Sequence, residues 1–156
     1  MNQYGTTRRD VLKAAGILAA GAGTAMIRAV PADATPAAMQ AAIRRVIGEA
    51  SVKPGKVTLE IPPLVENGNT VPCAVTVESP MTAKDYVKAV HIFNEKNPQP
   101  NVISMHLGPR AGRANVSTRI RLSDTQTVVA IAELSDGSFW SASTNVIITL
   151  GACLED

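Results

Sequence analysis

Cysteine and histidine are the side chains best suited to covalent or metal chemistry, and this 156-residue chain has only two of each. Cys73 alternates with three valines, so we expect it to fill a small apolar position in the core. Cys153 follows Gly151-Ala152 directly and is the fourth residue from the C-terminus, beyond the last predicted strand. An exposed terminal thiol suits covalent attachment of a substrate, and a Cys73–Cys153 disulfide is the structural alternative.

The two histidines do not predict a catalytic or metal site. His91 and His106 both lie in alternating strand patterns, so we expect each on a sheet face rather than acting as a base. A soft-metal site formed by Cys73, His91, Met105 and His106 is the alternative, although their spacing shows no paired ligands. The sequence also lacks G-x-S-x-G, a glycine-rich phosphate loop and H-E-x-x-H, so we predict no catalytic residue, no metal and no cofactor.

Residues 1–34 have the pattern of an export signal. Arg8-Arg9 precedes a weakly hydrophobic run over residues 14–27, and Ala32-Asp33-Ala34 is the small-x-small pattern of a cleavage site. The paired arginines resemble the twin-arginine signal, which exports folded proteins to the periplasm. Arg28 limits the apolar run to less than the roughly 20 residues of a membrane span, and an uncleaved anchor is the alternative.

Length and charge limit the classes of function. The chain has one domain's length, with 46% hydrophobic and 18% charged residues, as in globular proteins. Residues 1–34 hold four of the 15 basic and two of the 13 acidic side chains, so the mature protein keeps 11 of each. A formally neutral protein with 3% aromatic residues has little to attract a nucleic acid, so we expect no such partner.

The predicted elements form one domain over residues 35–150, followed by an arm over 151–156. Thr35-Pro36 is an N-cap and N1 pair, and helical spacing of apolar residues predicts a helix over 36–48. Alternation and apolar runs predict strands over 57–61, 71–77, 88–93, 102–107, 116–122, 127–134, 139–140 and 145–150. Turn signals about every 8 to 12 residues favour a mainly β fold, an immunoglobulin-like antiparallel β-sandwich with an N-terminal amphipathic helix. Arg119 and Arg121 form a cationic row on an outer face, toward solvent or a partner.

Six blocks of the mature chain resemble the SoxY family of thiosulfate-oxidation carriers. They are residues 66–72 (ENGNTVP), 78–83 (ESPMTA), 90–98 (VHIFNEKNP), 117–122 (STRIRL), 125–130 (TQTVVA) and 134–140 (LSDGSFW). This family ends in a Gly-Gly-Cys-Gly-Gly arm, and Gly151-Ala152-Cys153 occupies that place. The resemblance therefore covers most of the mature chain, and the twin-arginine leader agrees with it.

The resemblance implies a carrier subunit rather than an enzyme. A haem protein, SoxAX, would join thiosulfate oxidatively to Cys153, giving a cysteine S-thiosulfonate and no other cofactor. The hydrolase SoxB would release sulfate, and a sulfane dehydrogenase or another sulfur acceptor would complete the cycle. The partner would be a SoxZ-like immunoglobulin-like subunit without its own leader, which a folded-protein export route could carry along. Gly151 and Ala152 would act as the hinge of the arm.

The end of the chain departs from the family pattern. Leu154-Glu155-Asp156 replaces the two final glycines, and Ala152 replaces a glycine before the cysteine. Side chains with a Cβ stiffen the arm, and the added carboxylates disfavour a thiolate and repel an anionic substrate. A scaffold or binding subunit of a Sox-type complex that has lost carrier turnover is therefore an alternative, and a periplasmic metal or redox binder is another.

Overall fold

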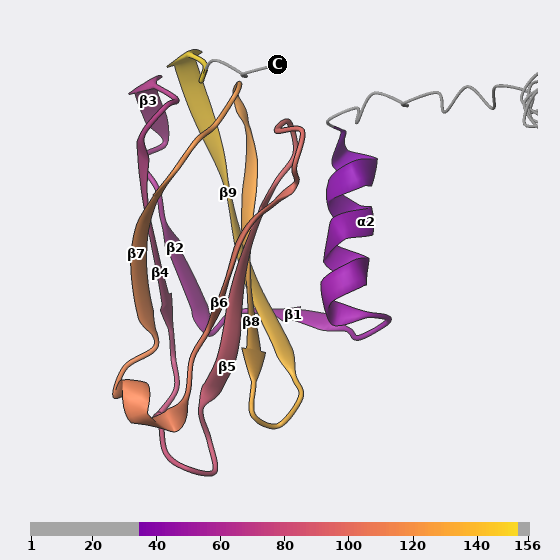
Figure 1. Ribbon diagram of the computed structural model, residues 1–156, viewed down its shortest axis with the longest axis vertical. Coiled ribbons are helices and arrows are strands. Elements are labelled where there is room, and N and C mark those ends of the chain that lie inside the picture. The colour runs from indigo at the N-terminus through magenta and orange to yellow at the C-terminus, as the bar shows by residue number, and fades with distance from the viewer. Residues whose placement is uncertain (1–34, 153–156) are drawn as a thin grey trace, which may run out of the picture. The chain divides into compact units, whose positions relative to one another are not determined.

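The computed structural model describes residues 35–152, which form two facing β-sheets and one helix against the larger sheet (Figure 1). The predicted immunoglobulin-like sandwich with its N-terminal helix is confirmed in this part of the chain. The predicted leader with Arg8 and Arg9, and the predicted attachment residue Cys153 with the three residues after it, lie outside the described residues.

Helix α2 spans Pro36–Ile47 and begins where the sequence predicts. Thr35 caps it, because its side-chain Oγ1 accepts a hydrogen bond from the backbone N–H of Ala38 at 3.1 Å. At the other end the backbone N–H of Gly48 donates to the carbonyl of Arg44 at 2.9 Å. No helix of the described residues is long and apolar enough to cross a membrane.

The smaller sheet has the strand order β2-β4-β7, with both pairings antiparallel. The strands span Val57–Glu60 (β2), Val71–Val77 (β4) and Asn115–Ile120 (β7). In β4 every second side chain is buried, as the alternating sequence predicts. Ile120 of β7 is also buried whereas Arg119 and Arg121 are exposed, so the predicted outward cationic row is confirmed.

The larger sheet has the order β1-β9-β8-β5-β6, and β3 also pairs with β9. Its strands span Val52–Pro54 (β1), Leu64–Asn67 (β3), Val87–Asn94 (β5), Asn101–His106 (β6), Gln126–Leu134 (β8) and Phe139–Leu150 (β9). The two segments predicted over 139–140 and 145–150 are thus parts of one twelve-residue strand. A short 3-10 helix over Pro109–Ala111 precedes β7 and was not predicted.

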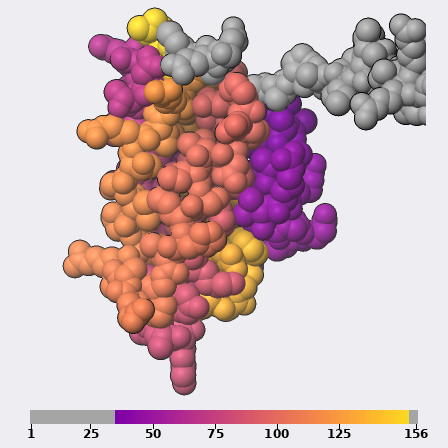
Figure 2. Space-filling model, in the orientation of Figure 1, coloured from indigo at the N-terminus to yellow at the C-terminus, as the bar shows by residue number. Residues whose placement is uncertain are grey.

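Strand β5 is buried on both faces because a layer covers each side of it. Val90 and Ile92 face the other sheet in the main core. Phe93, which is completely buried, faces the helix and packs with Met39 and Ile43 of α2. Figure 2 shows the helix lying along the side of the strands. The nearly continuous apolar sequence of β5 follows from this double covering.

Strands β1 and β3 are not predicted by the sequence, and both pair with β9 in parallel. Between them the chain crosses to the other sheet as β2, through a turn in which Gly55 and Lys56 have positive φ angles of 105° and 55°. Three- and four-residue strands carry too little alternation to be recognised, and β3 starts directly after Pro62-Pro63. Strand β9 therefore runs along the sheet from its pairing with β1 near its start to its pairing with β3 near its end.

Replacing Phe93 with alanine should uncouple the helix from the sheet. The substitution leaves a cavity between α2 and strands β5 and β8, which we expect to lower the free energy of unfolding by about 3–5 kcal/mol. Chemical denaturation followed by circular dichroism measures the change. Leu64→Ala is the control, because Leu64 is exposed and its loss should cost less than about 0.5 kcal/mol. Equal effects of the two substitutions would contradict this account of the packing.

Candidate functional site

The described chain ends in a backbone junction of three segments. After β9 ends at Leu150, the carbonyl of Leu150 accepts a hydrogen bond from the N–H of Gly68 at 2.8 Å. The carbonyl of Gly68 accepts from the N–H of Leu122 at 2.9 Å, and the carbonyl of Leu122 accepts from the N–H of Ala152 at 3.0 Å. These bonds connect the end of the chain to the turn after β3 and to the loop after β7.

Two glycines allow this close approach. A Cβ at Gly68 would collide with the carbonyl oxygen of Leu122 and lie 2.9 Å from the nitrogen of Ala152. A Cβ at Gly151 would collide with the carbonyl oxygen of Ser123. All three obstacles are backbone atoms, which cannot turn aside as the end of a flexible side chain can. Ala152 is itself buried, with 8% of its surface exposed, so Gly151 and Ala152 are both packed in place.

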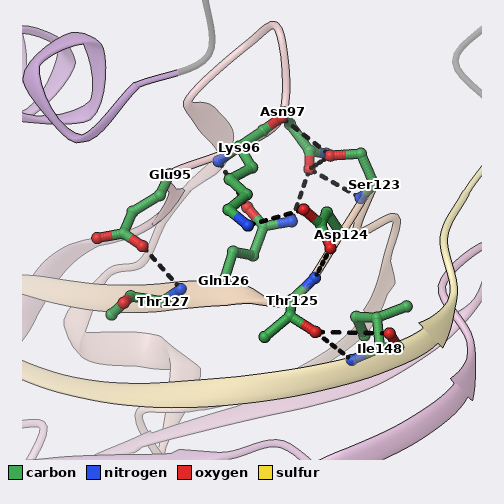
Figure 3. A network of polar contacts seen from close by, with 9 residues as sticks. All are labelled: Glu95, Lys96, Asn97, Ser123, Asp124, Thr125, Gln126, Thr127 and Ile148. Atoms are coloured by element: carbon green, nitrogen blue, oxygen red, sulfur yellow. Dashed lines mark hydrogen bonds and ion pairs between the residues drawn. The ribbon is translucent and has the colours of Figure 1, made fainter.

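A polar network holds the loop of residues 121–125 that receives the chain end (Figure 3). The Oδ1 atom of Asn97 accepts hydrogen bonds from the N–H of Ser123 at 3.1 Å and from Nε2 of Gln126 at 3.0 Å. The Nδ2 atom of Asn97 donates to the carbonyl of Arg121 at 2.8 Å. Gln126 is buried, and its Oε1 accepts from the N–H of Lys96 at 2.8 Å. Asn97 and Gln126 thus connect the loop after β5 to the loop after β7.

Further bonds tie the same loop to Lys96 and to strand β9. Lys96 forms an ion pair with Asp124 at 2.7 Å. The hydrogen bonds that Asp124 accepts from Lys96 and from the N–H of Thr125 hold the pKa of its carboxyl below its usual range. The Oγ1 atom of Thr125 accepts from the N–H of Ile148 at 3.0 Å. Both partners in the ion pair are exposed, so its contribution to stability is small. The loop is positioned chiefly by the half-buried and buried amides.

Cys73 lies in the core, as the sequence predicts. Only 2% of its surface is exposed, and it packs in the main cluster between the two sheets. Burial raises the pKa of the Cys73 thiol to about 11, since a thiolate loses its hydration there. The thiol is free, and at neutral pH it stays protonated and shielded from reagents.

The four residues of the alternative soft-metal site do not converge. His91 and His106 are close, with ring centroids 6.3 Å apart, and Nδ1 of His91 lies 2.8 Å from Oγ of Ser104. Burial, and then the nearby His106, lowers the pKa of His91. Met105, however, packs against the inter-sheet core, and Cys73 belongs to the other sheet. Within residues 35–152 no group of three histidine, cysteine or acidic side chains could hold a metal ion.

The sequence does not single out the residues that fix the chain end. Gly68 and Asn97 occur in turn signals, and both fall within the blocks that carry the family resemblance, but neither has a chemical group that suggests this role. Leu122 and Ser123 act through backbone carbonyls, which are the same in every residue type. Only the tertiary structure shows that Gly68, Leu122 and Ser123 meet Gly151 and Ala152. It alone also shows that Asn97 holds the loop to which Leu122 and Ser123 belong.

Asn97→Ala should destabilise the loop that receives the chain end. It removes the acceptor for the N–H of Ser123 and for Nε2 of the buried Gln126, at about 1–3 kcal/mol for each unsatisfied group. The free energy of unfolding from denaturant titration tests this. Asn115→Ala is a matched control, because the exposed Asn115 side chain makes one bond, to Thr76. A loss no larger than that of Asn115→Ala would show that the Asn97 network does not hold the loop.

Native Cys73 should resist alkylation at pH 8.5, because it is buried and its raised pKa keeps it protonated. Iodoacetamide treatment followed by peptide mapping should find Cys73 unmodified in the folded protein and modified in guanidinium chloride. Labelling of Cys73 at the same rate in both states would contradict the structure.

Comparison with known proteins agrees with this architecture. The family model described as "Sulfur oxidation protein SoxY" matches residues 43–153. The sulfur carrier protein SoxY from Chlorobium limicola f thiosulfatophilum is similar in structure, with a TM-score of 0.61, 26% identity and coverage of 72% of this chain and 96% of that chain. No curated protein matches the sequence.

The sandwich itself also occurs in superoxide reductases. The enzyme from Ignicoccus hospitalis has a TM-score of 0.54 at 15% identity, covering 75% of this chain and 95% of that one. The enzyme from Nanoarchaeum equitans has a TM-score of 0.52 at 12% identity, covering 62% and 100%. These likenesses show a shared fold only, whereas the family match spans most of the chain. The chain therefore belongs to the SoxY family of sulfur oxidation proteins.

Proposed function

We propose that the mature protein is a periplasmic carrier that holds thiosulfate-derived sulfur covalently on Cys153. The observation that carries this proposal is the contrast between the two cysteines. Cys73 is sealed in the core with its pKa raised to about 11, so it cannot serve as an exchangeable attachment point. The SoxY family match ends at residue 153, on the other cysteine, and residues 151–152 carry the chain to the surface loops described above.

The loading step is an oxidation. The Cys153 thiol and the sulfane sulfur of thiosulfate form a new S–S bond, giving a cysteine S-thiosulfonate with loss of two electrons and the thiol proton. A SoxAX-type haem protein would take the electrons. A SoxB-type hydrolase would then add water to the sulfonate and release it as sulfate, leaving the sulfane sulfur on Cys153. This chain supplies the thiol and its placement and needs no resident metal or cofactor.

The proposed partners follow from this role. A SoxZ-like subunit would form a heterodimer with the sandwich, and a sulfane dehydrogenase-type enzyme would remove the remaining sulfur. The twin-arginine pattern at Arg8-Arg9 supports export of the folded protein to the periplasm. Folded export would also allow a leaderless SoxZ-like subunit to travel with this chain. An oxidising compartment suits a thiol whose function is to form an S–S bond.

The acidic tail supports a second candidate, a scaffold subunit that pairs within a Sox-type complex but does not turn over. Leu154-Glu155-Asp156 brings two side-chain carboxylates next to Cys153. Negative charge there raises the pKa of a thiol and repels thiosulfate, so it opposes loading. This candidate would bind a SoxZ-like subunit but give no SoxB-dependent release of sulfate.

Cys153→Ser should abolish loading. The mature chain is incubated with thiosulfate, a SoxAX-type haem protein and an electron acceptor, and intact-mass spectrometry should show one added thiosulfonate group in the wild type and none in Cys153→Ser. Cys73→Ala is the matched control and should load like the wild type, because Cys73 is shielded in the core.

Two outcomes would overturn the carrier proposal. Loading that persists in Cys153→Ser would place the adduct elsewhere. A wild-type chain that binds a SoxZ-like subunit but never gains the adduct would favour the scaffold candidate, and substituting glycines for Glu155 and Asp156 would then test whether the acidic tail is responsible.

A further inference from the structure

We propose that Gly68, Leu122 and Ser123 form a C-terminal seat that fixes Gly151 and Ala152, so that a tether of one peptide bond joins Cys153 to a fixed residue. This inference rests on the proposed carrier function. Gly151 then serves close packing rather than hinge motion. The seat residues are positioning residues for the attachment chemistry.

Hydrogen bonds and burial both fix the end of the described chain. The N–H of Ala152 donates to the carbonyl of Leu122 at 3.0 Å, and the N–H of Leu122 donates to the carbonyl of Gly68 at 2.9 Å. The N–H of Gly68 donates in turn to the carbonyl of Leu150 at 2.8 Å, so the chain is bonded at Leu150 and again at Ala152. A freely swinging glycine hinge would leave Ala152 exposed, whereas Ala152 is buried with 8% exposure.

The absence of space for a Cβ is a second, independent observation. At a hinge, glycine would be favoured because it can adopt backbone angles closed to other residues. The φ angles of Gly68 and Gly151, however, lie outside the positive range that favours glycine. At both positions a side chain would instead collide with a backbone carbonyl, of Leu122 for Gly68 and of Ser123 for Gly151. Both glycines are therefore required by contact between the end of the chain and the loop.

The loop that provides the carbonyls is itself held on two sides. Asn97 binds Ser123, and Thr125 binds Ile148 of β9 (Figure 3). The Nδ2 atom of Asn97 also donates to the carbonyl of Arg121. The seat is thus connected to the sheet through the loop after β5 and through β9. Because this support does not depend on the arm, the seat fixes the point from which Cys153 departs.

The short tether determines how a partner enzyme reaches the thiol. Consecutive Cα atoms lie about 3.8 Å apart, so Cys153 begins one peptide unit from a fixed residue. We therefore expect an enzyme that acts on Cys153 to contact the described segments that touch Gly151 and Ala152, which are the turn at Gly68 and the loop at residues 121–125. The partner surface so defined lies at the end of the sandwich where β3 and β9 end.

A spin label tests the seat without any partner enzyme. In a Cys73→Ala background, a nitroxide is attached to Cys153 of the mature chain and its motion is measured by electron paramagnetic resonance. We expect a restricted spectrum for the parent and a more mobile one for Gly151→Ala and Gly68→Ala. Gly108→Ala is the control and should match the parent, because a Cβ there meets no atom within 4 Å. Circular dichroism and the unfolding midpoint confirm that each variant is folded.

Lengthening the tether tests its consequence for the chemistry. Two glycines inserted between Ala152 and Cys153 leave the seat intact and should slow enzymatic loading with thiosulfate by about 100-fold, as expected for a misplaced reacting group. Alkylation of Cys153 by iodoacetamide should stay within about twofold of the parent, because a small free reagent needs no docking.

Three outcomes decide the proposal. A parent spectrum as mobile as that of Gly151→Ala would overturn the seat, and loading of the insertion variant at the parent rate would overturn the short tether. If the parent protein is not loaded at all, the carrier function fails instead, while the spin-label spectra still decide whether the seat exists.

Discussion

Strand β9 is the constraint on which the rest of this structure depends. It pairs along most of its length with β8, and the opposite edge pairs with β1 near its start and β3 near its end. The helix packs on the same sheet through the residues of β5 and β8. A twelve-residue strand bound on both edges is a rigid support, and Gly151 and Ala152 follow directly after its end. The placement of these two residues therefore depends on the whole sandwich.

Burial makes Cys73 chemically inert. A thiolate requires water or a positive charge nearby, and Cys73 has neither, so its pKa is raised and it behaves as a small apolar side chain. In the proposed function, the attachment of sulfur then falls to Cys153. The acidic residues that follow Cys153 in the sequence would oppose a thiolate, so the proposed loading would depend on a partner that neutralises them.

The polar loops at residues 95–99 and 121–125 position the backbone carbonyls that contact Gly151 and Ala152. The amides of Asn97 and Gln126 join two loops that are about thirty residues apart in sequence, with the Nε2 atom of Gln126 bonded to Oδ1 of Asn97. Such bonds keep two carbonyls in place for the chain end. If the proposed carrier function holds, this placement of residues 151–152 bears on how the attachment residue is offered to partner enzymes.

The sequence alone determined the helix, most of the strands and the buried position of Cys73, because periodicity is a local signal. The family followed from the resemblance of six sequence blocks. The sequence did not reveal β1 and β3, which are too short to show a period and form only where β9 offers the edge that β8 leaves free. It also did not reveal the contacts of Gly68 and Gly151, because the sequence suggests only a turn at Gly68 and a hinge at Gly151. Those contacts involve backbone atoms from segments far apart in the chain, so only the tertiary structure brings them together.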